Sequence, residues 1–147
     1  MLDDKDWKII SVLKKNSKLS TQQIAKKTLI PTTTIHNRIK KLEKTGVIKN
    51  YTIVLDDKKA GKNISAYILL TVDYKLLKEK GVTQHEIAKM LKNHEFVEEV
   101  SMITGRSDIV IRIKVNDVEE LDTFITKYLR NMDGVEKTET MMILSSF

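Results

Sequence analysis

Polar and basic side chains recur along residues 32–44 at spacings that place them on one face of a helix. Hydroxyl, amide, guanidinium and ammonium groups donate hydrogen bonds to base edges and phosphate oxygens, which is the chemistry of duplex DNA recognition. The outward face, with Thr33, Asn37, Lys40, Lys41 and Lys44, lies opposite an apolar row formed by Ile35, Ile39 and Leu42, and His36 and Arg38 lie on its flanks. We therefore predict DNA contacts from Thr32, Thr33, Thr34, His36, Asn37, Arg38, Lys40, Lys41 and Lys44.

A helix-turn-helix pattern over residues 20–46 positions this face. Ser20 and Gln23 have the spacing of a capping box that starts a helix. Pro31 lacks an amide donor, so the first helix ends before it and the second begins beside it, and Gly46 can close that second helix. A solvated, lysine-rich face on an ordinary core helix is the alternative. The combination of cap, turn, proline and basic face favours a helix that reads DNA.

A further helix is predicted over residues 2–16. Acidic residues in its first turns and lysines in its last turn suit the helix dipole. Leu2, Ile9 and Leu13 form its apolar row, so three helices can close a small hydrophobic cluster. Trp7 lies off this row, where it either packs half-exposed or contacts another domain or subunit.

Charge is distributed unevenly along the 147 residues, whose formal net charge is +6. Residues 1–50 hold 12 Lys and Arg against 4 Asp and Glu, whereas residues 51–147 hold 14 against 16. A basic front and a faintly acidic rear indicate that a polyanion binds the front only.

Cysteine is absent from the sequence, which excludes disulfides and thiolate metal sites. Neither a signal-peptide pattern nor an apolar run long enough to span a membrane is visible. We therefore expect a soluble, cytoplasmic protein with no membrane partner and no bound metal.

The periodicity changes after Gly46. Residues 47–55 are rich in β-branched side chains and predict an extended strand, and residues 56–63 form a polar connection. We expect a DNA-binding domain over residues 1–50, a connecting strand and linker over 51–63, and a second domain over 64–147.

The second domain has the element order βαββαβ. In residues 109–115, isoleucine and valine alternate with Val110, Arg112 and Lys114, which is the period of a strand buried on one face. The order predicts a ferredoxin-like domain, with both helices on one face of an antiparallel sheet, and an α+β chain overall. The expected strands are 64–73, 97–103, 109–115 and 135–145, and the expected helices are 83–93 and 118–132.

The strands carry more apolar surface than one helix-covered sheet face can hide. Burying a large apolar side chain contributes about 1.5–3 kcal/mol, so we expect the second face to pack against another protomer. The alternative is an amphipathic face that meets water with a few scattered apolar residues. The residues concerned are Ala66, Ile68, Leu70, Val72, Met141, Met142, Ile143 and Leu144.

No residues have the spacing of a catalytic or metal site. The sequence contains neither a P-loop nor a nucleophile elbow, and His36, His85 and His94 do not have the spacing of metal ligands. His85 and His94 are predicted to be helix-surface residues. We expect no enzyme activity and no cofactor, with a small-molecule enzyme as the remote alternative, because ferredoxin-like domains can host catalysis.

Five strings of the sequence carry a resemblance to a known family. They are LDDKDWKII, IAKK, TTIHNRIKKLEKTGVI, ITGRSDIVIRI and GVEKTETMMIL. With these strings, essentially the whole chain resembles the Lrp/AsnC family of leucine-responsive, or feast/famine, transcription regulators. The resemblance implies that the N-terminal part binds DNA and the C-terminal part dimerises through its sheets. It further implies that dimers assemble into rings, commonly octamers, with amino acids bound where dimers meet, near the TG-x-x-D loop.

Three positions differ from residues that are frequent in the family. Glycine in the inter-helix turn and serine at the next helix cap are replaced by Leu29 and Pro31. A non-glycine residue in a left-handed turn costs about 1–2 kcal/mol, so we expect a turn of different shape. An aromatic residue before the loop aspartate is replaced by Ser107.

The loop at residues 104–108 has groups that could hold an amino-acid effector. Gly105 lets backbone amides approach a carboxylate, and Asp108 offers an anion to an ammonium group. As an isolated pattern, Gly-x-x-Asp is typical of an ordinary hairpin turn, and only its place in the family resemblance favours an effector site. The candidate effector residues are Thr104, Gly105, Arg106, Ser107 and Asp108, with Thr138 and Thr140 on the last strand.

These features together predict a sequence-specific transcriptional regulator that is a dimer or a higher oligomer. A dimer carries two DNA-reading helices, so we expect its DNA sites to be inverted repeats. A sequence-tolerant, chromosome-organising protein is the alternative, because phosphate contacts alone would use the same lysines.

Overall fold

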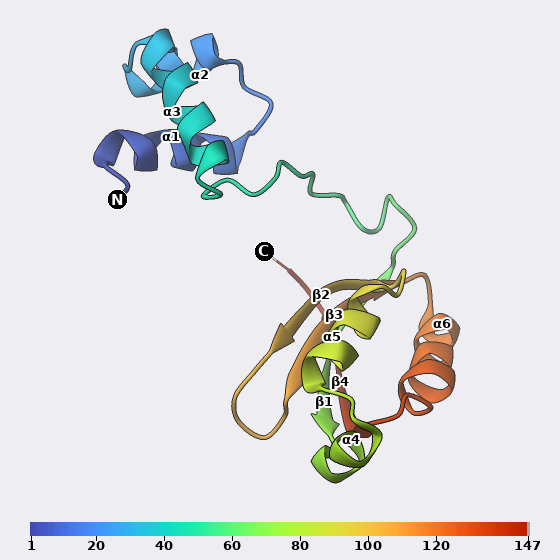
Figure 1. Ribbon diagram of the computed structural model, residues 1–147. Helices are drawn as coiled ribbons and strands as arrows, with labels where there is room; N and C mark the ends of the chain where they lie inside the picture. Colours follow the sequence, from blue (N-terminus) through green and yellow to red (C-terminus); the bar gives the residue numbers. More distant parts are fainter. Residues whose placement is uncertain (147) are drawn as a thin grey trace. The chain divides into compact units, whose positions relative to one another are not determined.

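Side-chain caps begin the first two helices of the chain. The computed structural model describes residues 1–146, with the three helices of the first unit labelled in Figure 1. Asp3 and Ser20 each accept a hydrogen bond from the third helical amide. The side chain of that third residue reciprocates, so both helices start with a capping box. The predicted helices are confirmed as α1 Asp4–Lys15, α2 Thr21–Thr28 and α3 Thr32–Lys44.

The turn between α2 and α3 is left-handed although no glycine occupies it. Leu29 has φ 56° and ψ 31°, and its amide donates to the Ala25 carbonyl at 2.9 Å. The expectation of a differently shaped turn is therefore wrong, because the chain keeps the left-handed conformation with a leucine. The Leu29 side chain is 91% exposed, whereas the next residue, Ile30, is buried.

Isoleucines from all three helices and the turn form the core of the first unit. Ile9, Ile24, Ile30 and Ile35 are buried together, and Trp7 is 57% exposed. Five half-buried side chains surround this cluster: Val12, Leu13, Leu19, Ala25 and Ile39.

Residues 47–55 form no strand, so that prediction is wrong for the single chain. Within the described residues, no amide of residues 49–55 donates a hydrogen bond. A strand needs a neighbouring strand for its backbone groups, and β-branched composition alone cannot supply one. The chain divides within this segment, between Val54 and Leu55, into two separately packed units.

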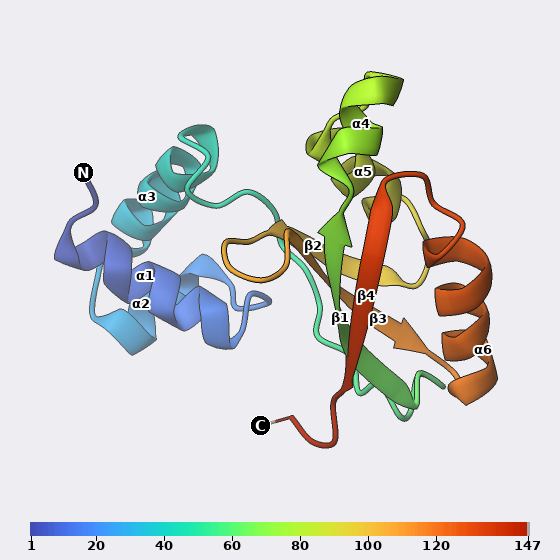
Figure 2. The ribbon, with the colours of Figure 1, turned by 90° about the horizontal axis from the view of Figure 1, so that it is seen from below.

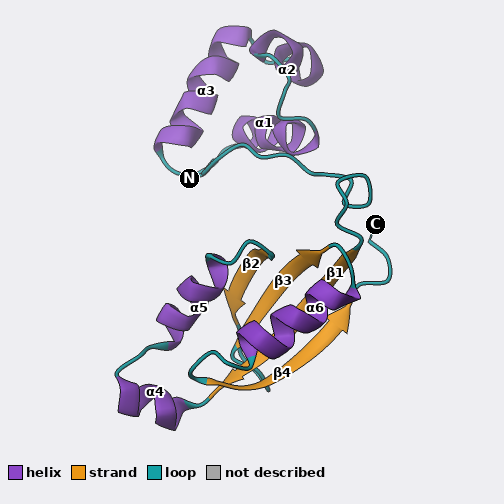
Figure 3. Ribbon diagram, turned by 90° about the vertical axis from the view of Figure 1, so that its right-hand side faces the viewer, coloured by secondary structure: helices purple, strands orange, loops and turns teal. Residues whose placement is uncertain are grey.

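The second unit confirms the predicted βαββαβ order and adds one helix. Its antiparallel sheet has the strand order β2-β3-β1-β4. Helices α5 and α6 cover one face of this sheet (Figure 3). The strands are β1 Ile64–Val72, β2 Val97–Met102, β3 Ile109–Val115 and β4 Val135–Met142; the helices are α4 Tyr74–Lys80, α5 Gln84–Lys92, α6 Val118–Thr123 and its π-helical continuation η1 Phe124–Leu129.

Helix α4 was not among the predicted elements. Asp73 caps its start by accepting from the Leu76 amide, and Gly81, with φ 66°, closes its end. An acidic N-cap and a following glycine were visible in the sequence, but the helix has only seven residues.

The alternating residues of β1 and β3 form the core beneath the helices. Ala66, Ile68, Leu70 and Val72 are each 2% exposed or less. The chain's own helices therefore hide the β1 residues that were expected to favour association. In Figure 2 no helix lies in front of the strands of this sheet. By strand register, the sheet face opposite the core contains Tyr67, Leu69, Val110 and Met141 together with the charged residues Glu99, Arg112, Lys114 and Glu139.

His94 is a half-buried member of an aromatic cluster, so its prediction as a surface residue is wrong. Its ring lies 5.0 Å from Phe96, 4.7 Å from Phe124 and 4.4 Å from Tyr128, measured between ring centroids. Burial lowers the pKa of His94 below its ordinary value.

Candidate DNA-binding face and sensing loop

Helix α3 is fixed by its apolar side and leaves its polar side exposed. Ile35 and Leu42 are buried at 0% and 2% exposure. Pro31 occupies the N-cap without a side-chain hydrogen bond, so the first amides of α3 are left free of side-chain caps. Among the predicted DNA contacts, Thr34 and Arg38 are half-buried, and Thr32, Thr33, His36, Asn37, Lys40, Lys41 and Lys44 are exposed.

Arg38 does not extend freely from this face. Its Nη1 atom lies 2.6 Å from the Asp3 carboxylate and 2.9 Å from Asp6 Oδ1. The structure thus brings two carboxylates of α1 to the flank of a helix face that the sequence presents as free of acids. A hollow of about 310 Å³ lies at this junction, lined by Met1, Asp3, Asp6, Thr34, Asn37, Arg38 and Lys41.

The loop at residues 103–108 joins β2 to β3 as a hairpin. The Ile103 amide donates to the Asp108 carbonyl at 2.9 Å, and the Asp108 amide donates to the Leu70 carbonyl at 2.9 Å. Gly105 has φ 117°, a conformation that an L side chain rarely adopts. Gly105 and Asp108 therefore lie in the same hairpin loop, at one end of the sheet. Thr104 and Arg106, in the same loop, are exposed.

Asp108 is held in place by neutral donors. Its Oδ2 atom accepts from the Val72 amide at 2.9 Å, and its Oδ1 atom accepts from the Tyr74 hydroxyl at 2.7 Å. The Gln84 side-chain amide donates to the Asp108 carbonyl oxygen at 3.0 Å. The hydrogen bond to Asp108 raises the pKa of Tyr74 above its ordinary value.

Tyr74 and Gln84 were missed as members of this site. They lie 34 and 24 residues before Asp108 in the chain, so no local pattern connects them to the loop. Strand pairing places Thr138 opposite Leu70, level with Ile109 at the start of β3, whereas Thr140 lies opposite Ile68, two residues further from the loop.

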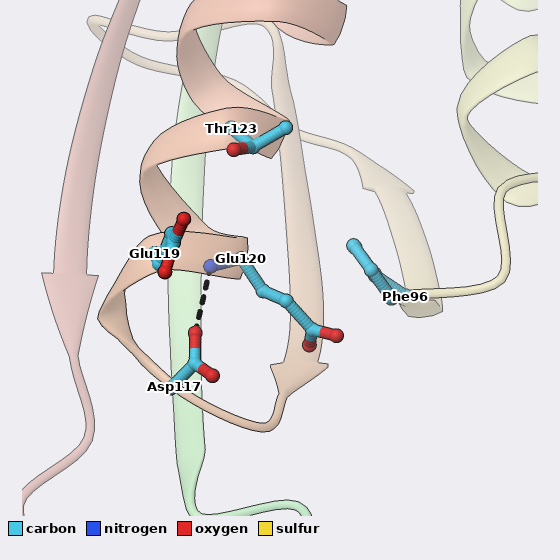
Figure 4. A pocket seen from close by; sticks show the side chains of 5 residues that line it. All are labelled: Phe96, Asp117, Glu119, Glu120 and Thr123. Atoms are coloured by element: carbon cyan, nitrogen blue, oxygen red, sulfur yellow. Dashed lines mark hydrogen bonds between the residues drawn. The ribbon is translucent and has the colours of Figure 1, made fainter.

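A second hollow lies between the start of β2 and the start of α6. Phe96, Asp117, Glu119, Glu120 and Thr123 line it, as Figure 4 shows. Asp117 accepts from the Glu120 amide and Glu120 accepts from Asn116, so two of the three carboxylates cap or brace the helix start. Within residues 1–146, no cluster of histidine and carboxylate side chains has metal-binding geometry.

None of the helices in the described part of the chain is both long and apolar enough to cross a membrane.

Comparison with known proteins gives matches along both units. The model of the Lrp/AsnC ligand binding domain matches residues 65–147, and that of a winged helix-turn-helix DNA-binding domain matches residues 2–49. The HTH-type transcriptional regulator FL11 of Pyrococcus furiosus is 38% identical over 98% of this chain and 90% of its own. No strand follows α3 within the first unit, so the described residues there contain no wing.

Two solved structures share the fold over nearly their whole length. LrpC of B. subtilis superposes with a TM-score of 0.84 and 26% identity, covering 100% of this chain and 97% of that one. The regulator NMB0573 of Neisseria meningitidis, solved as a complex with L-Met, gives a TM-score of 0.88 at 20% identity, covering 99% and 91%.

A helix-turn-helix unit followed by a ferredoxin-like unit with a ligand-binding match defines a DNA-binding transcriptional regulator. Both family models and the FL11 relative agree on this architecture. The chain belongs to the Lrp/AsnC family.

Proposed function

We propose that this protein is a sequence-specific transcriptional regulator that reads duplex DNA with α3. The supporting observation is the exposed side of the first three turns of α3, between Thr32 and Lys41, which carries donors and no acid. Glu43 is the one acidic residue of α3, and it accepts from the Tyr51 hydroxyl at 2.8 Å. Such a surface attracts phosphates and offers amide and hydroxyl groups to base edges.

Asn37 is the proposed base-reading residue and Lys41 the proposed phosphate contact. An amide can form two hydrogen bonds with adenine, whereas an ammonium group acts mainly on the backbone charge. Asn37→Ala should lower the preference for a cognate duplex by roughly tenfold, and Lys41→Ala should weaken cognate and random duplexes alike. Lys89→Ala, on the exposed side of α5, is the matched control. Equal losses on both duplexes for Asn37→Ala would contradict the assignment and favour a sequence-tolerant DNA-coating role.

Protomers are proposed to associate through the helix-free sheet face. Tyr67 and Met141 are 38% and 45% exposed there, and the Arg112 Nε atom is buried without a hydrogen-bond partner among residues 1–146. A buried donor that lacks a partner is costly, and a facing protomer would supply one. Tyr67→Glu should reduce the mass seen in sedimentation, whereas Lys75→Glu, on α4, should not.

A dimer of this kind would carry two copies of α3, so its DNA sites are proposed to be inverted repeats. Half-site centres should lie in steps of about 10–10.5 bp. Footprinting of DNA fragments selected from a random pool tests this. Protection of a single asymmetric half-site, or sedimentation as a monomer at micromolar concentration, would contradict the proposed dimer. Sedimentation also distinguishes a dimer from an octamer.

The loop at residues 104–108 is proposed to bind an amino-acid effector. The Asp108 carboxylate has about four acceptor positions, and the Val72 amide and Tyr74 hydroxyl use two of them. Its donors are neutral, so its negative charge can still attract an ammonium group. The methionine bound by the Neisseria relative makes that amino acid a reasonable first member of a test panel.

Calorimetric titration of amino acids into wild type and Asp108→Ala tests the effector site. The variant should bind the effector at least roughly tenfold more weakly, with little change in DNA affinity without effector. Asp108→Asn keeps an acceptor for the loop while removing the charge, so it separates ligand loss from loop damage. A wild-type protein that binds no amino acid would rule out the sensing role.

A further inference from the structure

Two carboxylates from the start of α1 hold one guanidinium from the middle of α3. We call Asp3, Asp6 and Arg38 the α1–α3 clamp. Arg38 Nη1 lies 2.6 Å from both Asp3 oxygens and 2.9 Å from Asp6 Oδ1. The Asp6 side chain is only 5% exposed, whereas that of Asp3 is 55% exposed. The clamp therefore has a buried half and a solvent-facing half.

The same two carboxylates also form the capping box of α1. The Asp6 amide donates to Asp3 Oδ1 at 3.0 Å, and the Asp3 amide donates to Asp6 Oδ2 at 3.1 Å. Because each carboxylate is fixed by the first turn of α1, the position of Arg38 is fixed too. The hydrogen bond from Arg38 lowers the pKa of Asp3, so the Asp3 carboxylate stays ionised at neutral pH.

Arg38 lies among the residues proposed to face DNA. Thr34 precedes it by four residues and Lys41 follows it by three, so all three share one side of α3. Thr34, Asn37 and Lys41 line the same hollow as the clamp. A rotation of α3 about its axis would change which of these groups can approach a base edge.

We propose that Arg38 is a positioning residue, and that Asp3 and Asp6 determine sequence preference by fixing the rotation of α3 against α1. This inference rests on the proposed reading of DNA by α3. The two carboxylates lie outside the helix-turn-helix segment and are repelled by phosphates, so they act on DNA through Arg38.

Arg38 has a second effect on the same surface. Two carboxylates and one guanidinium leave the clamp with a net charge of −1, and removing the guanidinium would leave −2 beside the DNA-facing residues. Loss of Arg38 should therefore weaken all duplexes, as well as reducing discrimination. Asp3→Asn and Asp6→Asn remove negative charge instead, so they should not weaken all duplexes. Loss of discrimination is therefore the one effect expected of every clamp variant.

Fluorescence anisotropy of the full-length protein separates these effects. One duplex is selected from a random pool by the wild type, the other is its scrambled counterpart, and salt is held constant. The variants are Asp3→Asn, Asp6→Asn, Arg38→Gln and the Asp6→Asn/Arg38→Gln double variant. Each should reduce the ratio of cognate to scrambled affinity by roughly tenfold, and the double variant should lose no more than Arg38→Gln alone.

Asp4→Asn is the matched control. Asp4 lies in the same first turn of α1 and is exposed, and within the described residues it has no ion pair. It should keep the wild-type ratio. If Asp6→Asn unfolds at the assay temperature, Asp3→Asn provides the test in its place, because the Asp3 side chain is half-exposed.

Two results would overturn the inference. If Arg38→Gln loses discrimination while Asp3→Asn and Asp6→Asn keep it, the guanidinium itself contacts bases. A lowered melting temperature with unchanged discrimination in every variant would make the clamp a purely structural contact. Failure of the wild type to bind any duplex would refute the proposed function itself, which is a distinguishable outcome.

Discussion

The α1–α3 clamp and the Asp108 loop hold a charged side chain in opposite ways. Arg38 is held by two carboxylates, whereas Asp108 is held by a backbone amide and a phenol, both neutral. Partners of opposite charge orient a group and cancel the field that would attract a ligand. Neutral donors orient a group and leave its charge available. A charged residue in a candidate site must therefore be judged by the charge of its partners.

The largest expected contrast comes from replacing each aspartate with asparagine. Asp6→Asn removes the charge that holds Arg38 and should lower the free energy of unfolding of the first unit by about 2 kcal/mol. At position 108, asparagine can still accept from the Val72 amide and donate to the Tyr74 oxygen, so we expect a loss of only about 0.5 kcal/mol.

Urea unfolding followed at two signals measures this contrast. Trp7, the sole tryptophan of the sequence, reports on the first unit through its fluorescence, and near-ultraviolet circular dichroism of the tyrosines reports mainly on the second. Asp4→Asn controls for the loss of an uncoupled charge. Equal losses of unfolding free energy in Asp6→Asn and Asp108→Asn would contradict the expected difference between the clamp and the Asp108 loop.

Backbone strain is a smaller difference between the two units. Leu29 is the one non-glycine residue of residues 1–146 with positive φ, and its side chain makes little contact. Leu29→Gly should raise the stability of the first unit by about 1 kcal/mol, because glycine tolerates this conformation. Lys27→Gly, within α2, should instead lower stability by about the same amount. Thermal melting at the Trp7 signal measures both, and a destabilised Leu29→Gly would show that no strain is stored there.

The smallest expected effect is a pH dependence of opposite sign in the two units. Arg38 lowers the folded pKa of Asp3, so that contribution to stability is present above pH 3.8 and lost as the pH falls through the folded pKa. Asp108 raises the folded pKa of Tyr74, so that contribution is present below pH 10 and lost as the pH rises through the folded pKa. Unfolding at several pH values should show slopes that Asp3→Asn and Tyr74→Phe respectively remove. If the pH dependence of stability persists in these variants, other titrating groups cause it.

Local patterns predicted most of the fold. The Ser20 and Gln23 capping box and Pro31 located α2 and α3, because helix ends depend on nearby residues. Alternation in β3 identified its buried face, and the βαββαβ order predicted the antiparallel four-stranded sheet. The candidate DNA face was predicted for the same reason, since helical spacing is a local property.

Long-range contacts account for what the sequence did not predict. Arg38 has its partners 35 and 32 residues away, and Asp108 has Tyr74 at 34 residues, so spacing gave no sign of either arrangement. His94 was placed on a surface because its aromatic neighbours Phe124 and Tyr128 lie on another helix. The predicted strand at residues 47–55 failed because strand propensity says nothing about whether a neighbouring strand exists.

The unpaired backbone of residues 49–55 determines how quickly this part of the chain exchanges hydrogen with water. Its amides have no acceptor among the described residues, whereas β3 is paired with β1 on one side and with β2 on the other. In deuterated buffer, a peptide from residues 49–55 should be labelled at the earliest times, and β3 should be labelled only through large-scale unfolding. If labelling of residues 49–55 slows as protein concentration rises, a second copy of the chain must be supplying the missing acceptors.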